Sequence, residues 1–174
     1  MKKLIVPIIL GLLVIGFPFT SFAAQDGVTA TATAELVEAL SADEVAQLNF
    51  GKFIAGVSGG TIAVANTLAG AITTTGTVAT IGGGSPSSAS FDISGLASQT
   101  VEITLPANGS VNLANESTPG DVMNVASFGV SASTVTLSST GDATVYVGAT
   151  LTVPASGIAV GVYSGTYQVT FAYQ

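Results

Sequence analysis

The stretch GVYSGTYQVTFAYQ, residues 161–174, decides the fold class of this chain. Residues 163–165 form a turn signal, and beyond it every second side chain is large and apolar. These side chains are Tyr167, Val169, Phe171 and Tyr173. A period of two is typical of a strand with one buried face. Because the pattern runs to the last residue, we expect a terminal strand inside a sheet, with these four side chains as a candidate acceptor strand for another segment.

The same strand-turn rhythm extends through the preceding sequence. Short strands are expected at residues 48–53, 61–65, 77–81, 89–93, 101–105, 111–113, 123–128, 135–137 and 143–153. Gly, Pro and Asn clusters separate them. About ten short strands at this spacing predict an all-β fold, with a single antiparallel β-sandwich of Ig-like or pilin-like type favoured over a closed barrel. The expected core residues are Phe91, Ile103, Leu105, Val145, Val147, Leu151, Val169 and Phe171.

The first residues have the three parts of an export signal. Lys2 and Lys3 precede an apolar run, and small residues at Ser21 and Ala23 fit a signal peptidase site. The apolar run, Leu4 to Phe19, has about 16 residues and is shorter than the roughly 20 that span a bilayer. We therefore expect a signal peptide over residues 1–23, a β-sandwich domain over 24–174, and no stable membrane insertion after cleavage.

A second alternating stretch, VTATATA, follows the cleavage site. Val28, Ala30, Ala32 and Ala34 share one face, and Thr residues occupy the other. Such a strand pairs within its own sheet or adds to an exposed edge of a neighbouring molecule, which makes it a candidate strand-exchange segment. Residues 35–40 read as a continued strand or a helical turn. Ser41 with Glu44 has the capping-box form, which predicts a short helical turn over residues 42–47.

Composition excludes several classes of function. The chain after residue 23 holds one cation, Lys52, and all ten acidic residues, so its formal side-chain charge is 1 − 10 = −9. That charge disfavours nucleic acid as a partner. The sequence has no Cys and no His, which removes disulfides, the usual transition-metal ligands and the usual base of a nucleophilic triad.

The remaining candidate sites use carboxylates, glycines or aromatic side chains. Asp92 and Glu102 are formally a carboxylate pair, but both are expected to point outward as solvated charges. Oxygen ligands for calcium remain available at Asp92, Glu116, Asp121 and Asp142, without the spacing of a calcium-binding loop. The glycines at 82–84 lack the Lys-Ser/Thr of a phosphate-binding loop. Tyr146 and Tyr163 read either as sugar-stacking platforms or as cross-strand packing partners. We expect no catalytic residue, no metal and no cofactor.

Several stretches together resemble the exported bacterial family named domain of unknown function 4402. They are LNFG at 48–51, ASFDISG at 89–95, VEITLP at 101–106, VGATLTV at 147–153 and GVYSGTY at 161–167. The resemblance implies a secreted β-sandwich without catalytic residues. A looser likeness, carried by the strand at 48–53 and the terminal strand with Tyr173, is to subunits of chaperone–usher pili. Those subunits commonly carry a disulfide, and this chain has no Cys.

These observations lead to one functional hypothesis and one alternative. The hypothesis is a non-enzymatic, exported structural protein of the cell surface, extracellular space or periplasm that self-associates into a filament by strand addition. The alternative is a secreted monomeric β-sandwich that binds a carbohydrate or a partner protein.

Overall fold

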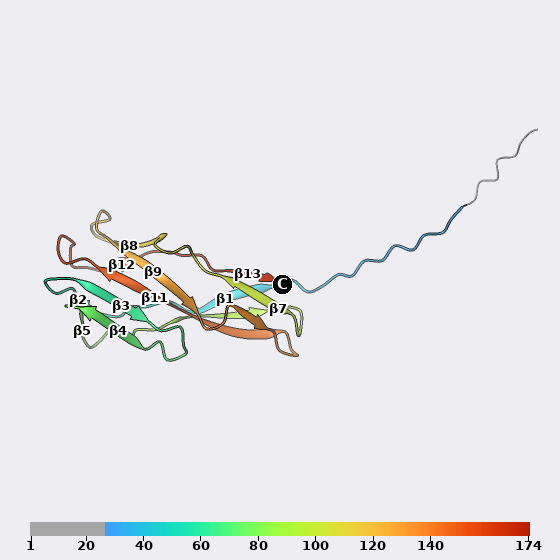
Figure 1. Ribbon diagram of the computed structural model, residues 1–174, viewed down its shortest axis with the longest axis horizontal. Coiled ribbons are helices and arrows are strands. Elements are labelled where there is room, and N and C mark those ends of the chain that lie inside the picture. The colour runs from blue at the N-terminus through green and yellow to red at the C-terminus, as the bar shows by residue number, and fades with distance from the viewer. Residues whose placement is uncertain (1–26) are drawn as a thin grey trace, which may run out of the picture. The chain divides into compact units, whose positions relative to one another are not determined.

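The computed structural model describes residues 27–174, and the described chain is built from strands without a helix (Figure 1). The strands are β1 (Ser41–Ala46), β2 (Phe53–Ile54), β3 (Gly60–Val64), β4 (Ile72–Gly76), β5 (Ala79–Thr80), β6 (Ala89–Ser94), β7 (Thr100–Thr104), β8 (Val111–Asn115), β9 (Val122–Val130), β10 (Thr134–Thr136), β11 (Asp142–Val153), β12 (Tyr163–Ser164) and β13 (Thr170–Tyr173). The all-β prediction is confirmed. No helix in this part of the chain is long and apolar enough to cross a bilayer.

The chain divides into two units, Met1–Glu35 and Leu36–Gln174. Of the first unit, the structure describes residues 27–35, which we call the arm. The arm forms no strand and all its side chains are exposed. Leu36–Gln174, which we call the folded unit, holds all thirteen strands. The expected signal peptide at residues 1–23 lies outside the described residues.

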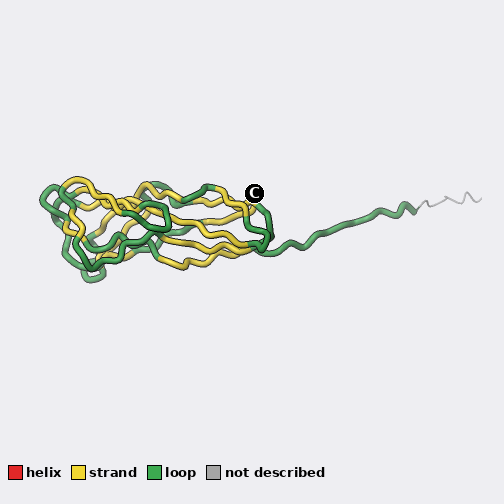
Figure 2. The backbone as a smooth tube through the Cα atoms, turned by 90° about the horizontal axis from the view of Figure 1, so that it is seen from below, coloured by secondary structure: helices red, strands yellow, loops and turns green. Residues whose placement is uncertain are grey.

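The strands of the folded unit form antiparallel sheets. The large sheet has the order β1-β6-β11-β9-β8-β12, with β3 pairing β11 and β4. A small sheet has the order β10-β7-β13, and β2 pairs β5. The strands run lengthwise through the folded unit (Figure 2). The two larger sheets leave β1, β12, β4, β10 and β13 as edge strands, so their outer backbone groups lack a strand partner within the described chain.

Strand β11 is the centre of the large sheet. Its first half pairs β6, and its second half pairs both β3 and β9. The alternation from Ala143 to Val153 supplies a buried face over this whole length. Gly148 lets β3 approach closely, because a Cβ at this position would overlap the carbonyl oxygen of Val64.

The buried side chains gather in two clusters. The first cluster contains Phe50, Ile62, Val64, Val78, Val111, Met123, Val125, Ala149, Leu151 and Val153. The second contains Ile93, Val101, Ile103, Leu137 and Val145. Since β6 and β11 belong to the large sheet and β7 to the small one, the second cluster packs these two sheets against each other.

The expected core is confirmed in part. Ile103, Val145, Val147 and Leu151 are buried. Phe91, Leu105, Val169 and Phe171 are half-buried and pack against the second cluster. Phe171 lies on the edge strand β13, and Leu105 and Val169 lie just outside the strands β7 and β13, so fewer neighbours cover these three side chains.

The helical turn expected at residues 42–47 is wrong. Residues 41–46 form β1, whose residues pair antiparallel with β6 from Ser41↔Ser94 to Ala46↔Ser90. Ser41 and Glu44 have the spacing of a helix cap. In the structure, however, the backbone N–H and C=O groups of residues 41–46 pair with β6 in a sheet. The segment at 35–40, expected to be a strand or a helical turn, is neither.

Three other expected elements are corrected. Tyr163 and Ser164, read as a turn, form β12. The strand expected at 48–53 is reduced to an isolated bridge between Asn49 and Ser87 and to the start of β2. The strand expected at 77–81 is only β5, and β4 before it was not predicted. Glycines with positive φ at positions 51, 56 and 76 interrupt regular pairing in this region.

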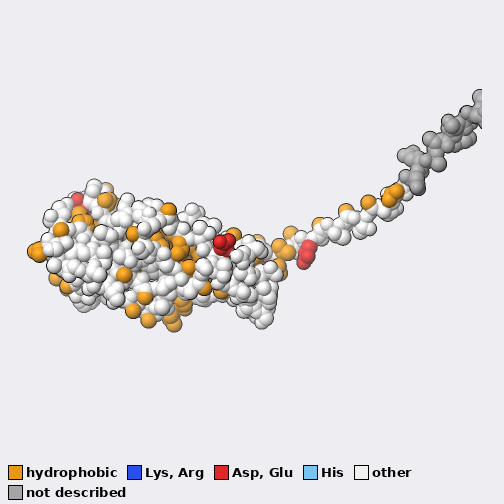
Figure 3. Space-filling model, viewed as in Figure 1, with side chains coloured by type: hydrophobic (Ala, Val, Ile, Leu, Met, Phe, Trp, Pro, Cys, Tyr) orange, Lys and Arg blue, Asp and Glu red, His pale blue; other side chains and the backbone are white. Residues whose placement is uncertain are grey.

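The visible face of the folded unit is mostly uncharged (Figure 3). White backbone and polar side chains cover most of it, hydrophobic atoms are scattered among them, and acidic atoms show at few places. This matches a sequence in which 7% of residues are charged.

Candidate functional site

The terminal segment links the two main sheets. β12 pairs β8 of the large sheet, through Tyr163↔Asn115 and Ser164↔Ala114. β13 pairs β7 of the small sheet, from Thr170↔Thr104 to Tyr173↔Val101. Among the described residues, residues 165–169 between these strands form no backbone–backbone hydrogen bond. The crossing segment therefore has main-chain donors and acceptors available for another strand.

The four side chains predicted for the terminal strand are all half-buried, but they divide between the clusters. Tyr167 packs on the first cluster, with its ring 5.3 Å from that of Phe128. Val169, Phe171 and Tyr173 pack on the second. The alternation of the sequence is confirmed, although only Phe171 and Tyr173 belong to β13.

A second irregular segment, residues 47–56, runs along the same cluster. Its described backbone pairing consists of the Asn49↔Ser87 bridge, the short β2–β5 pair and a bond from the Ile81 N–H to the Lys52 carbonyl. Leu48, Phe53 and Ala55 direct their side chains onto the first cluster. Together these features give an apolar but loosely paired wall.

A groove lies between these two irregular segments, and we call it the long groove. It encloses about 950 Å³. One wall is residues 47–56, and the other is residues 158–165 together with Tyr167. Its floor is made by core side chains of β8, β9 and β11: Val111, Leu113, Met123, Val125, Phe128 and Leu151. The long groove thus opens onto the first cluster between the loosely paired residues 47–56 and a wall whose strand pairing is limited to the short β12.

Asn115 fixes the second wall of the long groove. Its side chain is 1% exposed. The Oδ1 atom accepts hydrogen bonds from the backbone N–H groups of Ser117 at 2.8 Å and Thr118 at 3.1 Å, and Nδ2 donates to the Ala159 carbonyl at 3.3 Å. Because both polar atoms of this buried amide have a hydrogen-bond partner, the polar residue is tolerated in the core.

Tyr163 and Asp121 hold the same loop. The Tyr163 hydroxyl donates to the Ala159 carbonyl at 2.6 Å, and Asp121 Oδ2 accepts from the Ala159 N–H at 2.8 Å. Tyr163 is therefore a cross-linking side chain of the wall. Asp121, one of the residues considered for calcium, holds the loop through its carboxylate.

Tyr167 carries the one buried side-chain polar atom without a hydrogen-bond partner in the described chain, its hydroxyl oxygen. Burial raises the pKa of this hydroxyl, and the negative charge of Glu44 raises it further. A buried donor without an acceptor is unfavourable by about 1–3 kcal/mol. Other atoms of Tyr167 line the long groove, whereas the hydroxyl oxygen itself is buried.

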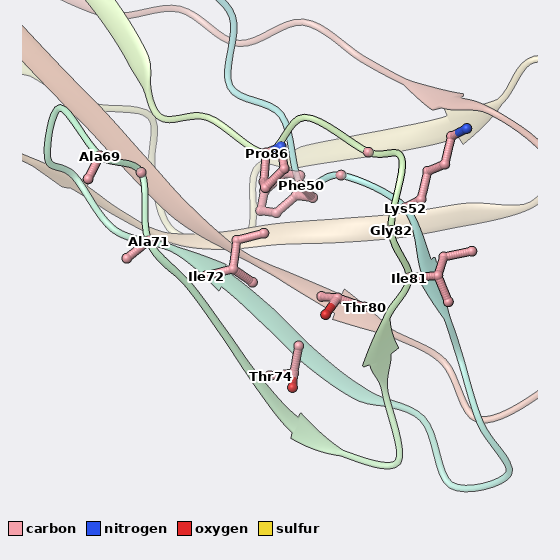
Figure 4. Close-up of a pocket in the computed structure, with 13 residues that line it drawn as sticks. Phe50, Lys52, Ala69, Ala71, Ile72, Thr74, Thr80, Ile81, Gly82 and Pro86 are labelled. Atoms are coloured by element: carbon pink, nitrogen blue, oxygen red, sulfur yellow. The ribbon is translucent and has the colours of Figure 1, made fainter.

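A smaller hollow of about 460 Å³ lies on the other side of Phe50. Figure 4 shows its lining, with the Lys52 ammonium turned away from Ile72 and Thr74. The glycines of the 82–84 stretch line this hollow in part, and Gly83 has φ 87° in a turn. The site therefore lacks a cation directed into it that would bind an anion.

The acidic side chains considered for catalysis or calcium lie apart. Asp92 is in the large sheet, where its Oδ1 accepts from the Thr144 hydroxyl at 2.7 Å, whereas Glu102 is in the small sheet. Asp142 accepts from Ser94 at 3.4 Å, and Glu116 is exposed. The described residues contain no group of three or more His, Cys, Asp or Glu side chains able to hold a metal ion.

Sequence reasoning missed Asn115 and Phe128. Asn115 begins the sequence NESTPGD, whose polar turn residues were a sign that a side chain there would cap the turn. Phe128 lies out of the alternation of Met123 and Val125, and β9 accommodates it by a bulge at Ser127, which has φ 50°.

Comparison with known proteins gives a family. No curated protein and no solved structure matches the chain. Residues 40–173 match the family described as "Domain of unknown function (DUF4402)", so the match covers nearly all of the folded unit and leaves the arm outside. The family expected from the five sequence stretches is therefore confirmed, and this chain belongs to the DUF4402 family.

Proposed function

We propose that this protein is a non-enzymatic structural subunit that is exported and joins copies of itself into an extracellular, pilus-like filament by β-strand addition. The folded unit acts as one sandwich domain in this proposal. Packing of Ile93 and Val145 from the large sheet on Val101 and Ile103 from the small one supports that architecture.

The observation that carries the proposal is the arm. Val28 is 86% exposed, and no residue from 27 to 35 belongs to a strand. Yet Val28, Ala30, Ala32 and Ala34 keep the alternation of a half-buried strand. An amphipathic strand pattern without a sheet to bury it is what a segment that pairs with another molecule requires.

The folded unit offers edges for such pairing. β1, β12 and β13 are edge strands, and few charges protect the visible surface (Figure 3). Natural proteins commonly blunt exposed edges with Lys, Pro or bulges. Lys52 is the single cation of the described chain and lies outside these edge strands. β1 carries the exposed Asp43 and Glu44, whereas β12 and β13 hold no charged residue. Uncharged edges such as β12 and β13 favour association between copies.

The test compares full-length wild type with two variants of the arm. Ala32→Lys puts a charge on its apolar face, and Thr31→Lys puts the same charge on the opposite face. We expect filaments from wild type and Thr31→Lys, and monomers from Ala32→Lys, by negative-stain microscopy of sheared material and by light scattering. Wild type that stays monomeric on cells and at high concentration would refute the proposal. Intact mass of the exported protein tests cleavage before Ala24.

A secreted binding module is the second candidate. Large apolar side chains are exposed on its loops, with Val57 87%, Leu68 80% and Val160 98% exposed. Loops are where binding residues concentrate. If wild type is monomeric, a glycan array and a Val160→Asp variant test this reading, with loss of ligand binding in the variant expected.

A further inference from the structure

Resting on the proposed function, we propose that the long groove is the acceptor site of the filament, and that its occupant is the segment from Val28 to Leu36 of a second copy, which is the arm extended by one residue of the folded unit. The long groove belongs to the folded unit alone. Its occupant is inferred from the length of the arm, the size of its side chains and the unpaired main-chain groups of the groove. The proposal places the docking surface beside Tyr167 and Leu48, at one end of the predicted acceptor strand.

The lengths agree. At about 3.3 Å per residue, the nine residues from Val28 to Leu36 extend over about 30 Å. The wall at residues 47–56 has a comparable length of chain. Leu36, which is 100% exposed, continues the even-numbered apolar face of the arm, because Glu35 separates it from Ala34. The arm therefore presents small side chains with a larger apolar one at each end.

The chemistry of the two surfaces also agrees. The floor of the long groove is already filled by side chains such as Met123 and Leu151, which are 2% and 1% exposed. Only small side chains can therefore pack on this floor, and the methyl groups of Ala30 and Ala32 are small enough. The Thr side chains of the arm would then face water, as on the rest of the surface.

The main chain of the groove lacks partners that a strand would supply. Residues 165–169 form no backbone–backbone hydrogen bond in the described chain, and residues 47–56 form few. A strand lying between them gains hydrogen bonds along its length, as in other complexes built by strand addition.

The arm of a second copy fits better than the chain's own arm. The Glu38 carbonyl accepts from the Tyr173 hydroxyl at 3.2 Å, and Leu40 packs on the second cluster. From this anchor β1 leads toward the long groove, which opens onto the first cluster. The chain's own arm would have to reverse at Leu36-Val37, and neither residue favours a tight turn.

Cross-linking between two single-cysteine proteins tests the placement. The chain has no Cys, so each introduced thiol is the only one in its molecule. Full-length Ala32→Cys is mixed with Leu48→Cys, in a wall of the long groove, or with the control Ala172→Cys, an exposed position on the β13 edge outside it. After mild oxidation, mass spectrometry should find the mixed disulfide with Leu48→Cys and not with Ala172→Cys.

The outcomes separate this inference from the proposed function. Filaments that need the apolar face of the arm but cross-link through Ala172→Cys, or through neither position, would overturn the groove and leave strand addition standing. A wild type that never polymerises would overturn both. Because the two thiols start on different molecules, insertion of each arm into its own groove would give no mixed disulfide and would also overturn the inference.

Peptide binding provides a second measurement. A synthetic peptide of residues 25–36 is titrated into full-length Ala32→Lys, whose own arm is blocked. Adding Val162→Asp to this protein puts a charge on the lining of the long groove and should weaken binding about 10-fold or more. Val45→Asp is the matched control, because Val45 is equally exposed, at 64%, but lies outside the lining, and it should leave binding unchanged. Equal affinities in the two variants, or a groove that binds an apolar dye but not the peptide, would overturn the inference.

Discussion

The hydroxyl of Tyr173 accepts a hydrogen bond of 2.6 Å from the backbone N–H of Leu96. The same hydroxyl donates to the Glu38 carbonyl at 3.2 Å. One phenol thus ties the terminal strand both to the loop after β6 and to the segment before β1. The sequence pattern places Tyr173 in the terminal strand but does not predict these two hydrogen bonds of its hydroxyl.

Removing that phenol tests its contribution. Tyr173→Phe leaves the Leu96 N–H without its acceptor, and we expect the free energy of unfolding to fall by about 1–3 kcal/mol. Urea denaturation measures the change. Tyr146→Phe is the control, because no hydrogen bond of the Tyr146 hydroxyl occurs in the described chain. Equal costs for both variants would show that the Tyr173 bonds do not stabilise the fold.

Asn115→Ala should destabilise the wall of the long groove. The substitution leaves the N–H groups of Ser117 and Thr118 and the Ala159 carbonyl without their common partner, at a cost of about 2 kcal/mol. Asn112→Ala, which loses one exposed bond from Asn124, should cost about 0.5 kcal/mol. Thermal unfolding compares them, and a larger loss for Asn112→Ala would contradict the assignment.

Phe91 and Phe171 should be energetically coupled. Their ring centroids are 5.7 Å apart with planes inclined by 54°, a tilted arrangement typical of aromatic pairs. Phe171→Ala should cost about 3 kcal/mol, the low end for a buried Phe, because the side chain is half-buried. A double-mutant cycle with Phe91→Ala should return about 0.5–1.5 kcal/mol of coupling. Strictly additive losses would mean that the rings do not interact.

Alkaline pH should destabilise the folded unit through Tyr167. Burial, with a further contribution from Glu44, raises the pKa of its hydroxyl in the folded state. Above about pH 10 an unfolded Tyr loses its proton while folded Tyr167 keeps it, so stability falls as pH rises. Tyr167→Phe should flatten this decline, and should also be as stable as wild type or more stable at pH 7, because it removes an unsatisfied group. A Tyr167→Phe protein with an unchanged alkaline slope would contradict this.

Local patterns predicted much of the fold. The burial of Ile103, Val145 and Leu151 follows from the alternation of apolar and polar residues, and this alternation is visible within each strand's own sequence. Strand partners do not follow from such patterns, because pairing of β13 with β7 joins segments far apart in sequence. The helix-like sequence at 41–46 failed for the same reason, since its distant partner β6 determined the outcome.

The candidate site was predicted less well. Tyr167 was chosen from its alternation, but its position in the long groove depends on residues 165–169 leaving both sheets. The displaced Phe128 depends on one residue of positive φ, Ser127. Neither feature has a reliable sequence signal, because both depend on how strands distant in sequence pair with each other.

The place of β13 in the chain also affects how the protein acquires its structure. This strand follows all the others, yet Phe171 and Tyr173 belong to the packing around the second cluster. During synthesis, that half of the core cannot close before β13 has been translated. Pairing between segments so distant in sequence is intrinsically slow. Until β13 arrives, one edge of its partner β7 stays unpaired, and an unpaired edge promotes aggregation.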